Sequence, residues 1–143
     1  MEGSANPLVG VWRLVTFETR SDDGQTDHLF GPDPAGLLIY TDNGHMSVSI
    51  ANARRRPFAA GDILAGTVDE KAAAMESYIS YCGRYEYRGE SVTHHVEMSL
   101  FPNWAGHGQE RRVSLDGDRL TLEAPPILIN GTERRTLLVW ERL

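Results

Sequence analysis

Residues 37–50 read LLIYTDNGHMSVSI, and this stretch decides the fold class. The tripeptide DNG at 42–44, set between apolar segments, is a strong local signal for a tight β-hairpin turn. After the turn, Met46, Val48 and Ile50 alternate with polar residues, which is typical of a strand with one buried face. The stretch therefore predicts two antiparallel strands joined by a short turn.

Similar turn signals recur along the rest of the chain. Glycine-containing turns at 88–90, 116–117 and 130–131 separate further stretches rich in β-branched and aromatic residues. The expected strands are 9–19, a short return near 26–30, 37–41, 45–50, 84–87, 91–100, 111–115, 119–123 and 134–142. We predict an all-β fold, an 8- or 9-stranded antiparallel up-and-down barrel, because closure of a barrel removes exposed sheet edges.

One helix interrupts the predicted strands. Thr67 and Glu70 form the pattern of a capping box, the alanine run 72–74 favours helix, and Gly83 can end it. The apolar residues of this segment fall at i, i+3, i+4 and i+7, namely Met75, Tyr78, Ile79 and Cys82. This stripe predicts an α-helix packed on the barrel wall or across one end.

The segment 51–66 before the helix is expected to be a loop. It contains Arg54-Arg55-Arg56-Pro57, a run of charge that usually belongs to a solvated surface. The alternative is a lid over the barrel mouth.

Composition places the chain among globular single domains. Its 143 residues are 41% hydrophobic and 24% charged, which suits one domain spanning 1–143. No apolar run is long enough to span a membrane, and a net charge of -6 argues against nucleic acid as a partner. A single cysteine and the lack of a visible secretory signal lead us to expect a cytoplasmic protein. The oligomeric state stays open, with a homodimer among the options.

Several motifs resemble those of a known family. Gly10-Val11-Trp12 resembles the G-x-W signature of lipocalins, which implies a tryptophan plugging the closed end of the barrel and an arginine, here Arg142, packed across it. The chain is also similar over nearly its full length to the bacterial and fungal lipocalin-like domain family. The stretches that carry this likeness are 36–40, 44–47, 94–97, 101–106, 109–111 and 117–122. The resemblance implies a ligand pocket and leaves the reaction open.

Strand alternation predicts which side chains face the lumen, because residues two apart share one side of a sheet. His94 lies in an apolar set and should point inward, whereas His95 should point outward. Gln109 and Arg111 share a face that the resemblance turns inward, which leaves Arg112 outside. The expected ligand-binding residues are Tyr40, Met46, Tyr87, Met98, Trp104 and Gln109, and the expected catalytic residues are His94, Arg111 and Tyr85.

The polar residues of the lumen allow more than one interpretation. Arg111 could belong to a hydrogen-bonded core network, or it could grip a carboxylate, enolate or other oxygen of a ligand. His94 could be a satisfied core histidine, a general acid or base, or a metal ligand. Metal binding is disfavoured because no second ligand lies at suitable spacing, so we predict neither a metal nor a cofactor.

Two functions fit these features. The first is a cofactor-independent cyclase, isomerase or dehydratase that acts on a hydrophobic, polyketide-like metabolite through confinement and acid-base help. The second is a binder or carrier that leaves such a molecule unchanged. The number of polar groups predicted to face inward slightly favours the enzyme. Both functions make a small hydrophobic molecule the expected partner.

Overall fold

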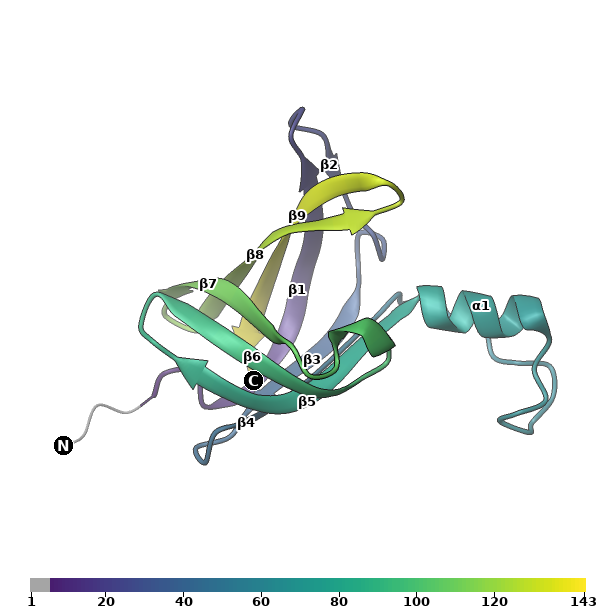
Figure 1. Ribbon diagram of the computed structural model, residues 1–143, viewed down its shortest axis with the longest axis horizontal. Coiled ribbons are helices and arrows are strands. Elements are labelled where there is room, and N and C mark those ends of the chain that lie inside the picture. Colours follow the sequence, from purple (N-terminus) through teal and green to yellow (C-terminus); the bar gives the residue numbers. More distant parts are fainter. Residues whose placement is uncertain (1–5) are drawn as a thin grey trace.

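Nine β-strands make up most of residues 6–143, the part of the chain that this computed structural model describes (Figure 1). They are β1 (Gly10–Ser21), β2 (Thr26–Asp27), β3 (Ala35–Tyr40), β4 (His45–Ala51), β5 (Tyr78–Tyr87), β6 (Ser91–Ser99), β7 (Gly108–Asp116), β8 (Arg119–Ile129) and β9 (Thr132–Arg142). Most strands are longer than the turn signals alone indicate, most clearly β5 at its start and β8 at its end, whereas β2 and β6 end earlier than expected.

The sheet closes on itself through β1. Strand β1 pairs antiparallel with β3 on one side and with β9 on the other, so Trp12 faces both Leu38 and Arg142 in the two ladders. The remaining neighbours follow chain order from β3 to β9, and β2 pairs only with the end of β1. The fold is thus a closed eight-stranded barrel with one extra strand, which confirms the predicted architecture. A barrel of eight strands has room inside for side chains or for one small ligand.

The turns follow the sequence signals. Gly44 ends the turn between β3 and β4 with φ 90°, a conformation that glycine adopts without strain. Asn130 and Gly131 both have positive φ, 50° and 79°, as a two-residue hairpin between β8 and β9 requires. The hairpin register set by these turns decides which strand face is buried.

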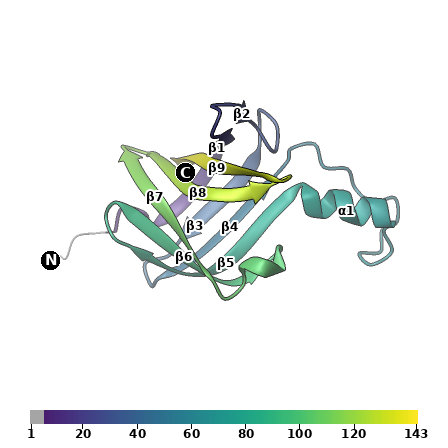
Figure 2. The ribbon, with the colours of Figure 1, turned by 45° about the horizontal axis from the view of Figure 1, so that its top comes forward.

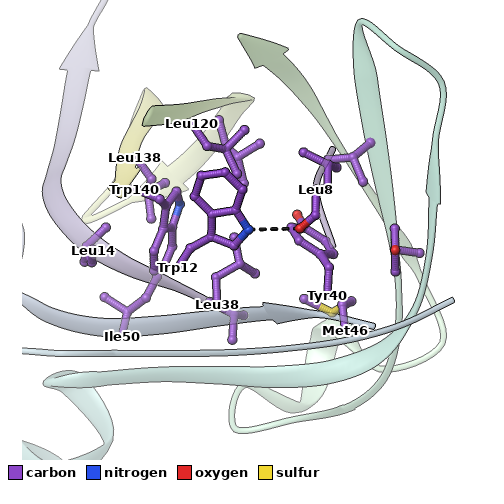
Figure 3. Close-up of a cluster of buried hydrophobic side chains, with 14 of the residues drawn as sticks. Leu8, Trp12, Leu14, Leu38, Tyr40, Met46, Ile50, Leu120, Leu138 and Trp140 are labelled. Atoms are coloured by element: carbon purple, nitrogen blue, oxygen red, sulfur yellow. Dashed lines mark hydrogen bonds between the residues drawn. The ribbon is translucent and has the colours of Figure 1, made fainter. Parts of the chain in front are cut away.

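One end of the barrel is shut by Trp12 (Figure 3). The buried indole donates from Nε1 to the carbonyl of Leu8 at 2.9 Å. The Arg142 guanidinium lies 4.3 Å from the centre of a Trp12 ring and donates to the Val9 carbonyl at 2.9 Å. A Cβ at Gly10 would lie 2.9 Å from Arg142 Nη1, so glycine leaves room for the arginine. This arrangement confirms what the G-x-W resemblance implied.

Helix α1 (Val68–Glu76) begins as predicted and ends earlier. Thr67 Oγ1 accepts from the Glu70 amide at 3.1 Å and Glu70 Oε1 accepts from the Thr67 amide at 2.9 Å, which is a complete capping box. The expected continuation to Gly83 is wrong, because Tyr78, Ile79 and Cys82 lie in β5 and pair with β4. Pairing with β4 gives the backbone N–H and C=O groups of this segment hydrogen-bond partners, and aromatic and β-branched residues favour the strand conformation.

The expected packing of the helix on the barrel is also wrong. None of the α1 side chains is buried. Both ribbon views show the helix extending away from the barrel, beyond the start of β5 (Figures 1 and 2). Three of the four residues of the expected apolar stripe belong to β5, so α1 has no continuous apolar stripe to bury. Within residues 6–143, no helix is long and apolar enough to cross a membrane.

The loop before α1 is held to the end of the helix by Arg55. Its Nε donates to Ser77 Oγ at 3.0 Å and its Nη2 donates to the Ala74 carbonyl at 3.1 Å. The same guanidinium lies 4.8 Å from the centre of the Tyr78 ring. Arg54 and Arg56 are exposed, which confirms the surface-loop interpretation of this charge run.

Candidate functional site

A cavity occupies the barrel interior, and its wall includes Leu38 and Trp140, which also belong to the buried core around the Trp12 plug (Figure 3). The volume inside the cavity that is open to the centre of a water-sized sphere is about 70 Å³. Most of its wall is aliphatic or aromatic, with a few polar groups among them. The lining residues are Phe17, Leu38, Val48, Ile50, Ile79, Tyr81, His94, Trp104, Gln109, Arg111, Leu122, Ile127, Thr136, Leu138 and Trp140. A mainly apolar wall with few polar groups is typical of small-molecule sites.

A chain of hydrogen bonds runs through the wall of this cavity. The Tyr40 hydroxyl lies 2.6 Å from His94 Nε2, and the Tyr81 hydroxyl lies 2.7 Å from His94 Nδ1. Strands β3, β6 and β5 supply the three side chains, and all three are buried, with His94 only 2% exposed. Both ring nitrogens of His94 are therefore already engaged by phenols.

Burial keeps the three side chains of this hydrogen-bond chain uncharged. It lowers the pKa of His94 to about 3, with the positive charge of Arg111 acting in the same direction. Burial also raises the pKa of Tyr81, against the opposing effect of Arg111, and raises the pKa of Tyr40 well above its ordinary value. At neutral pH the imidazole and both phenols are neutral.

Arg111 brings the positive charge of the site. It is half-buried on β7, and its guanidinium donates to Gln109 Oε1 and, at 3.1 Å, to the Glu110 carbonyl. Among residues 6–143 no carboxylate lies within ion-pair distance of it. A cation facing a largely apolar cavity without a counter-ion is a place where an oxygen of a ligand would be stabilised.

Four of the residues expected at the site line this cavity together. They are His94 on β6, Gln109 and Arg111 on β7, and Trp104, which ends a short 3₁₀ turn at Pro102–Trp104. Trp104 meets the Tyr81 ring edge-on, with the ring centres 6.0 Å apart. The predicted alternation is confirmed here: His95 faces out and bonds Glu86 at 2.9 Å, and Arg112 is exposed.

Four other expected residues lie away from the cavity wall. Tyr40 and Met46 are buried in the core near the Trp12 plug (Figure 3). Tyr40 is connected to the cavity wall by its hydrogen bond to His94. The Tyr85 hydroxyl donates to the Thr41 carbonyl at 2.6 Å and accepts from Asn6. Its hydrogen bonds therefore stabilise the closed end of the barrel. The Tyr87 hydroxyl donates to the Gly89 carbonyl at 3.0 Å in the next turn.

The inward orientation expected for Met98 is wrong, because its side chain is 68% exposed. The β5–β6 ladder pairs Cys82 with Met98 but Gly83 with Val96, so Glu97 is an extra residue. Such a β-bulge reverses the alternation of side chains beyond it. Met98 therefore faces out although Val96 faces in.

Tyr81 is the site residue that sequence reasoning missed. The expected helix covered its position, so its side chain was not assigned to the barrel. The alternation of Ile79, Tyr81, Tyr85 and Tyr87 through Gly83 is the signal that could have placed it on the inner face of a strand. Within the described residues, no group of three His, Cys, Asp or Glu side chains has a metal-binding arrangement.

Comparisons with known proteins agree with the architecture. A family model described as a lipocalin-like domain matches residues 9–143. The 4'-hydroxy-3'-methoxypropiophenone carrier protein ppsC of Aspergillus oryzae (strain ATCC 42149 / RIB 40) is 42% identical over 91 residues, which cover 57% of this chain and 82% of the carrier. The crystal structure of a lipocalin-like protein from Bacteroides uniformis ATCC 8492 matches with a TM-score of 0.50 at 14% identity, covering 96% of this chain and 100% of that one.

Proposed function

Since this chain belongs to the lipocalin-like domain family, we propose that it carries a small, mainly apolar metabolite of a biosynthetic pathway inside its barrel. The observation that carries the proposal is the cavity itself. Its wall is apolar except for Thr136 and one cluster, in which Arg111 has no carboxylate partner among the described residues. Such a cavity offers burial to a hydrophobic body and a fixed contact to one oxygen.

The name of the Aspergillus oryzae relative supports a carrier and suggests the class of cargo. The molecule in that name is an aromatic ketone whose ring bears a hydroxyl and a methoxy group. An aromatic ring suits a wall that includes Phe17, Trp104 and Trp140, and the oxygens suit the cluster around Arg111. We therefore propose an oxygenated aromatic or similarly hydrophobic metabolite as the ligand of this chain.

The state of His94 favours carriage over acid-base chemistry. A general acid or base works best when its pKa lies near the working pH, whereas the pKa of His94 is lowered to about 3. Both ring nitrogens are also occupied, at 2.6 and 2.7 Å, by phenols of the protein. Proton transfer between this imidazole and a ligand would first require one of these bonds to break.

Tryptophan fluorescence tests the proposal directly, because Trp104 and Trp140 both line the cavity. Titration with 4'-hydroxy-3'-methoxypropiophenone should quench the emission with a saturable curve. Arg111→Met should weaken binding by about 10-fold or more, since removal of a charged hydrogen-bond partner costs roughly 1.5–3 kcal/mol. Arg112→Met, on the outer face of the same strand, should bind like the wild type. Absence of saturable quenching, or equal binding by both variants, would contradict the proposed site.

A second candidate function is a cofactor-independent cyclase, isomerase or dehydratase. The feature that favours it is Arg111 beside Tyr81, since such donors stabilise negative charge that develops on an oxygen. Analysis of the molecule released from ligand-loaded protein distinguishes the two functions. A carrier releases its ligand unchanged, as shown by mass and by chromatographic retention, whereas an enzyme converts it.

A further inference from the structure

The buried hydroxyl of Tyr40 fixes the direction of the hydrogen-bond chain. Its side chain is 1% exposed, and its hydroxyl has His94 Nε2, at 2.6 Å, as its hydrogen-bond partner among residues 6–143. The phenol carries one hydrogen, and leaving that hydrogen unpaired in the core would cost free energy. Tyr40 therefore donates, and Nε2 of His94 accepts.

The tautomer of His94 follows from this. A neutral imidazole has one N–H, and because Nε2 accepts from Tyr40, the hydrogen lies on Nδ1. Nδ1 lies 2.7 Å from the Tyr81 hydroxyl and so donates to its oxygen. The Tyr81 hydrogen is then directed away from His94, on a side chain that lines the cavity.

The neighbouring polar residues also present hydrogens. Arginine can only donate, so the bond from Arg111 to Gln109 uses the amide oxygen of Gln109 and leaves its NH₂ group as a donor. The guanidinium itself keeps further N–H groups beyond its two bonds to Gln109 and Glu110. Of the side-chain acceptors in the cavity wall, the oxygen of Gln109 and the nitrogens of His94 are already used, which leaves the hydroxyl of Thr136 on β9.

We infer that Tyr81, Gln109 and Arg111 form a wall of hydrogen-bond donors, and that the ligand meets them with an acceptor oxygen, either a ketone carbonyl or a phenolate, and carries no amine there. Tyr40 is a positioning residue, which orients the Tyr81 hydrogen through His94 without reaching the cavity. This inference rests on the proposed function and names the chemical class of the cargo.

A pair of matched compounds tests the ligand class by titration calorimetry. Propiophenone offers a carbonyl, whereas 1-phenylpropan-1-amine has the same carbon skeleton and is a cation at neutral pH. The ketone should bind at least about 10-fold more tightly, because the ammonium has no acceptor and meets the charge of Arg111. Equal binding, or tighter binding of the amine, would overturn the inference and leave the proposed function intact. Failure of both compounds and of 4'-hydroxy-3'-methoxypropiophenone to bind would overturn the proposed function as well.

NMR of ¹⁵N-histidine-labelled wild-type protein tests the donor-to-acceptor direction of the hydrogen-bond chain from Tyr40 to Tyr81. At neutral pH we expect a protonated Nδ1 and an unprotonated Nε2 for His94, and a protonated Nε2 would overturn the inference. Tyr40→Phe removes the orienting donor and should weaken propiophenone binding by about 2- to 10-fold, the loss expected for one hydrogen bond. Tyr87→Phe removes a hydroxyl that bonds the Gly89 carbonyl away from the cavity, so it is the matched control and should bind as the wild type does. If Tyr40→Phe does not fold, the wild-type spectrum still shows which nitrogen of His94 is protonated and so tests the inference.

Discussion

His94 illustrates how a residue's surroundings decide between roles that its type leaves open. Its place on an apolar face allows a core histidine, a general acid or base, or a metal ligand. In the barrel, both ring nitrogens have phenol partners and the pKa is lowered to about 3. A metal ion or a proton would have to displace one of these partners, so the arrangement favours a neutral hydrogen-bonding residue.

The lowered pKa of His94 predicts a specific loss of stability in acid. The unfolded chain binds a proton at this histidine below about pH 6.5, whereas the folded chain binds it only near pH 3. Stability should therefore fall as the pH drops through this window, by about 1.4 kcal/mol per pH unit from this group. The groups that face the imidazole are Tyr40, Tyr81 and Arg111, and none of them supplies a compensating negative charge.

Urea unfolding between about pH 7 and about pH 4 measures this effect. His94→Gln keeps a donor and an acceptor but does not titrate, so its stability should depend less steeply on pH than that of the wild type. His107→Gln, at an exposed position, should keep the wild-type slope. Because several exposed carboxylates also titrate in this range, the readout is the difference between variants. Identical slopes for His94→Gln and the wild type would disprove a buried neutral histidine.

At the scale of elements, the bulge between β5 and β6 controls which residues reach the cavity. A Cβ at Gly83 would lie 2.0 Å from the carbonyl oxygen of His95, so only glycine fits where the strands approach. The obstacle is backbone, which cannot move aside without breaking the ladder. The bulge turns Met98 outward, whereas the regular alternation of β5 keeps Tyr81 on the lumen side.

Gly83→Ala should therefore destabilise the barrel by about 3 kcal/mol or more, at the upper end of the cost of overpacking. Thermal and urea unfolding measure this cost. Gly61→Ala is the matched control, because a Cβ at Gly61 meets nothing within 4 Å, and it should leave stability nearly unchanged. A fully stable Gly83→Ala protein would mean that the bulge is not held by this close contact.

The elements that the sequence predicts well are those with local causes. Hairpin turns and the capping box depend on residues a few positions apart, and the structure confirms them. The helix end was missed because Met75, Tyr78, Ile79 and Cys82 happen to match a helical period, whereas pairing with β4 decides the conformation. The bulge was missed because it depends on a partner strand, and with it the orientation of Met98.

The whole molecule divides its interior between stability and binding. At one end Trp12, Leu8 and Arg142 fill and seal the barrel, so this end has no room for a ligand. The cavity lies in the same interior, and His94, Gln109 and Arg111 line it together. These three residues could be predicted from alternation and resemblance, whereas Tyr40 bonds His94 from outside the cavity wall and the Tyr85 hydroxyl bonds the Thr41 carbonyl.

Methyl-labelled NMR during titration with 4'-hydroxy-3'-methoxypropiophenone tests most directly whether the lumen is the binding site. Resonances of the lining residues Val48, Ile79 and Leu122 should shift with saturation, because an aromatic ligand in the cavity lies against them. Those of the exposed residues Ile63 and Leu128 should stay in place. Shifts confined to the exposed methyl groups, with the lumen resonances unchanged, would contradict a ligand site inside the barrel.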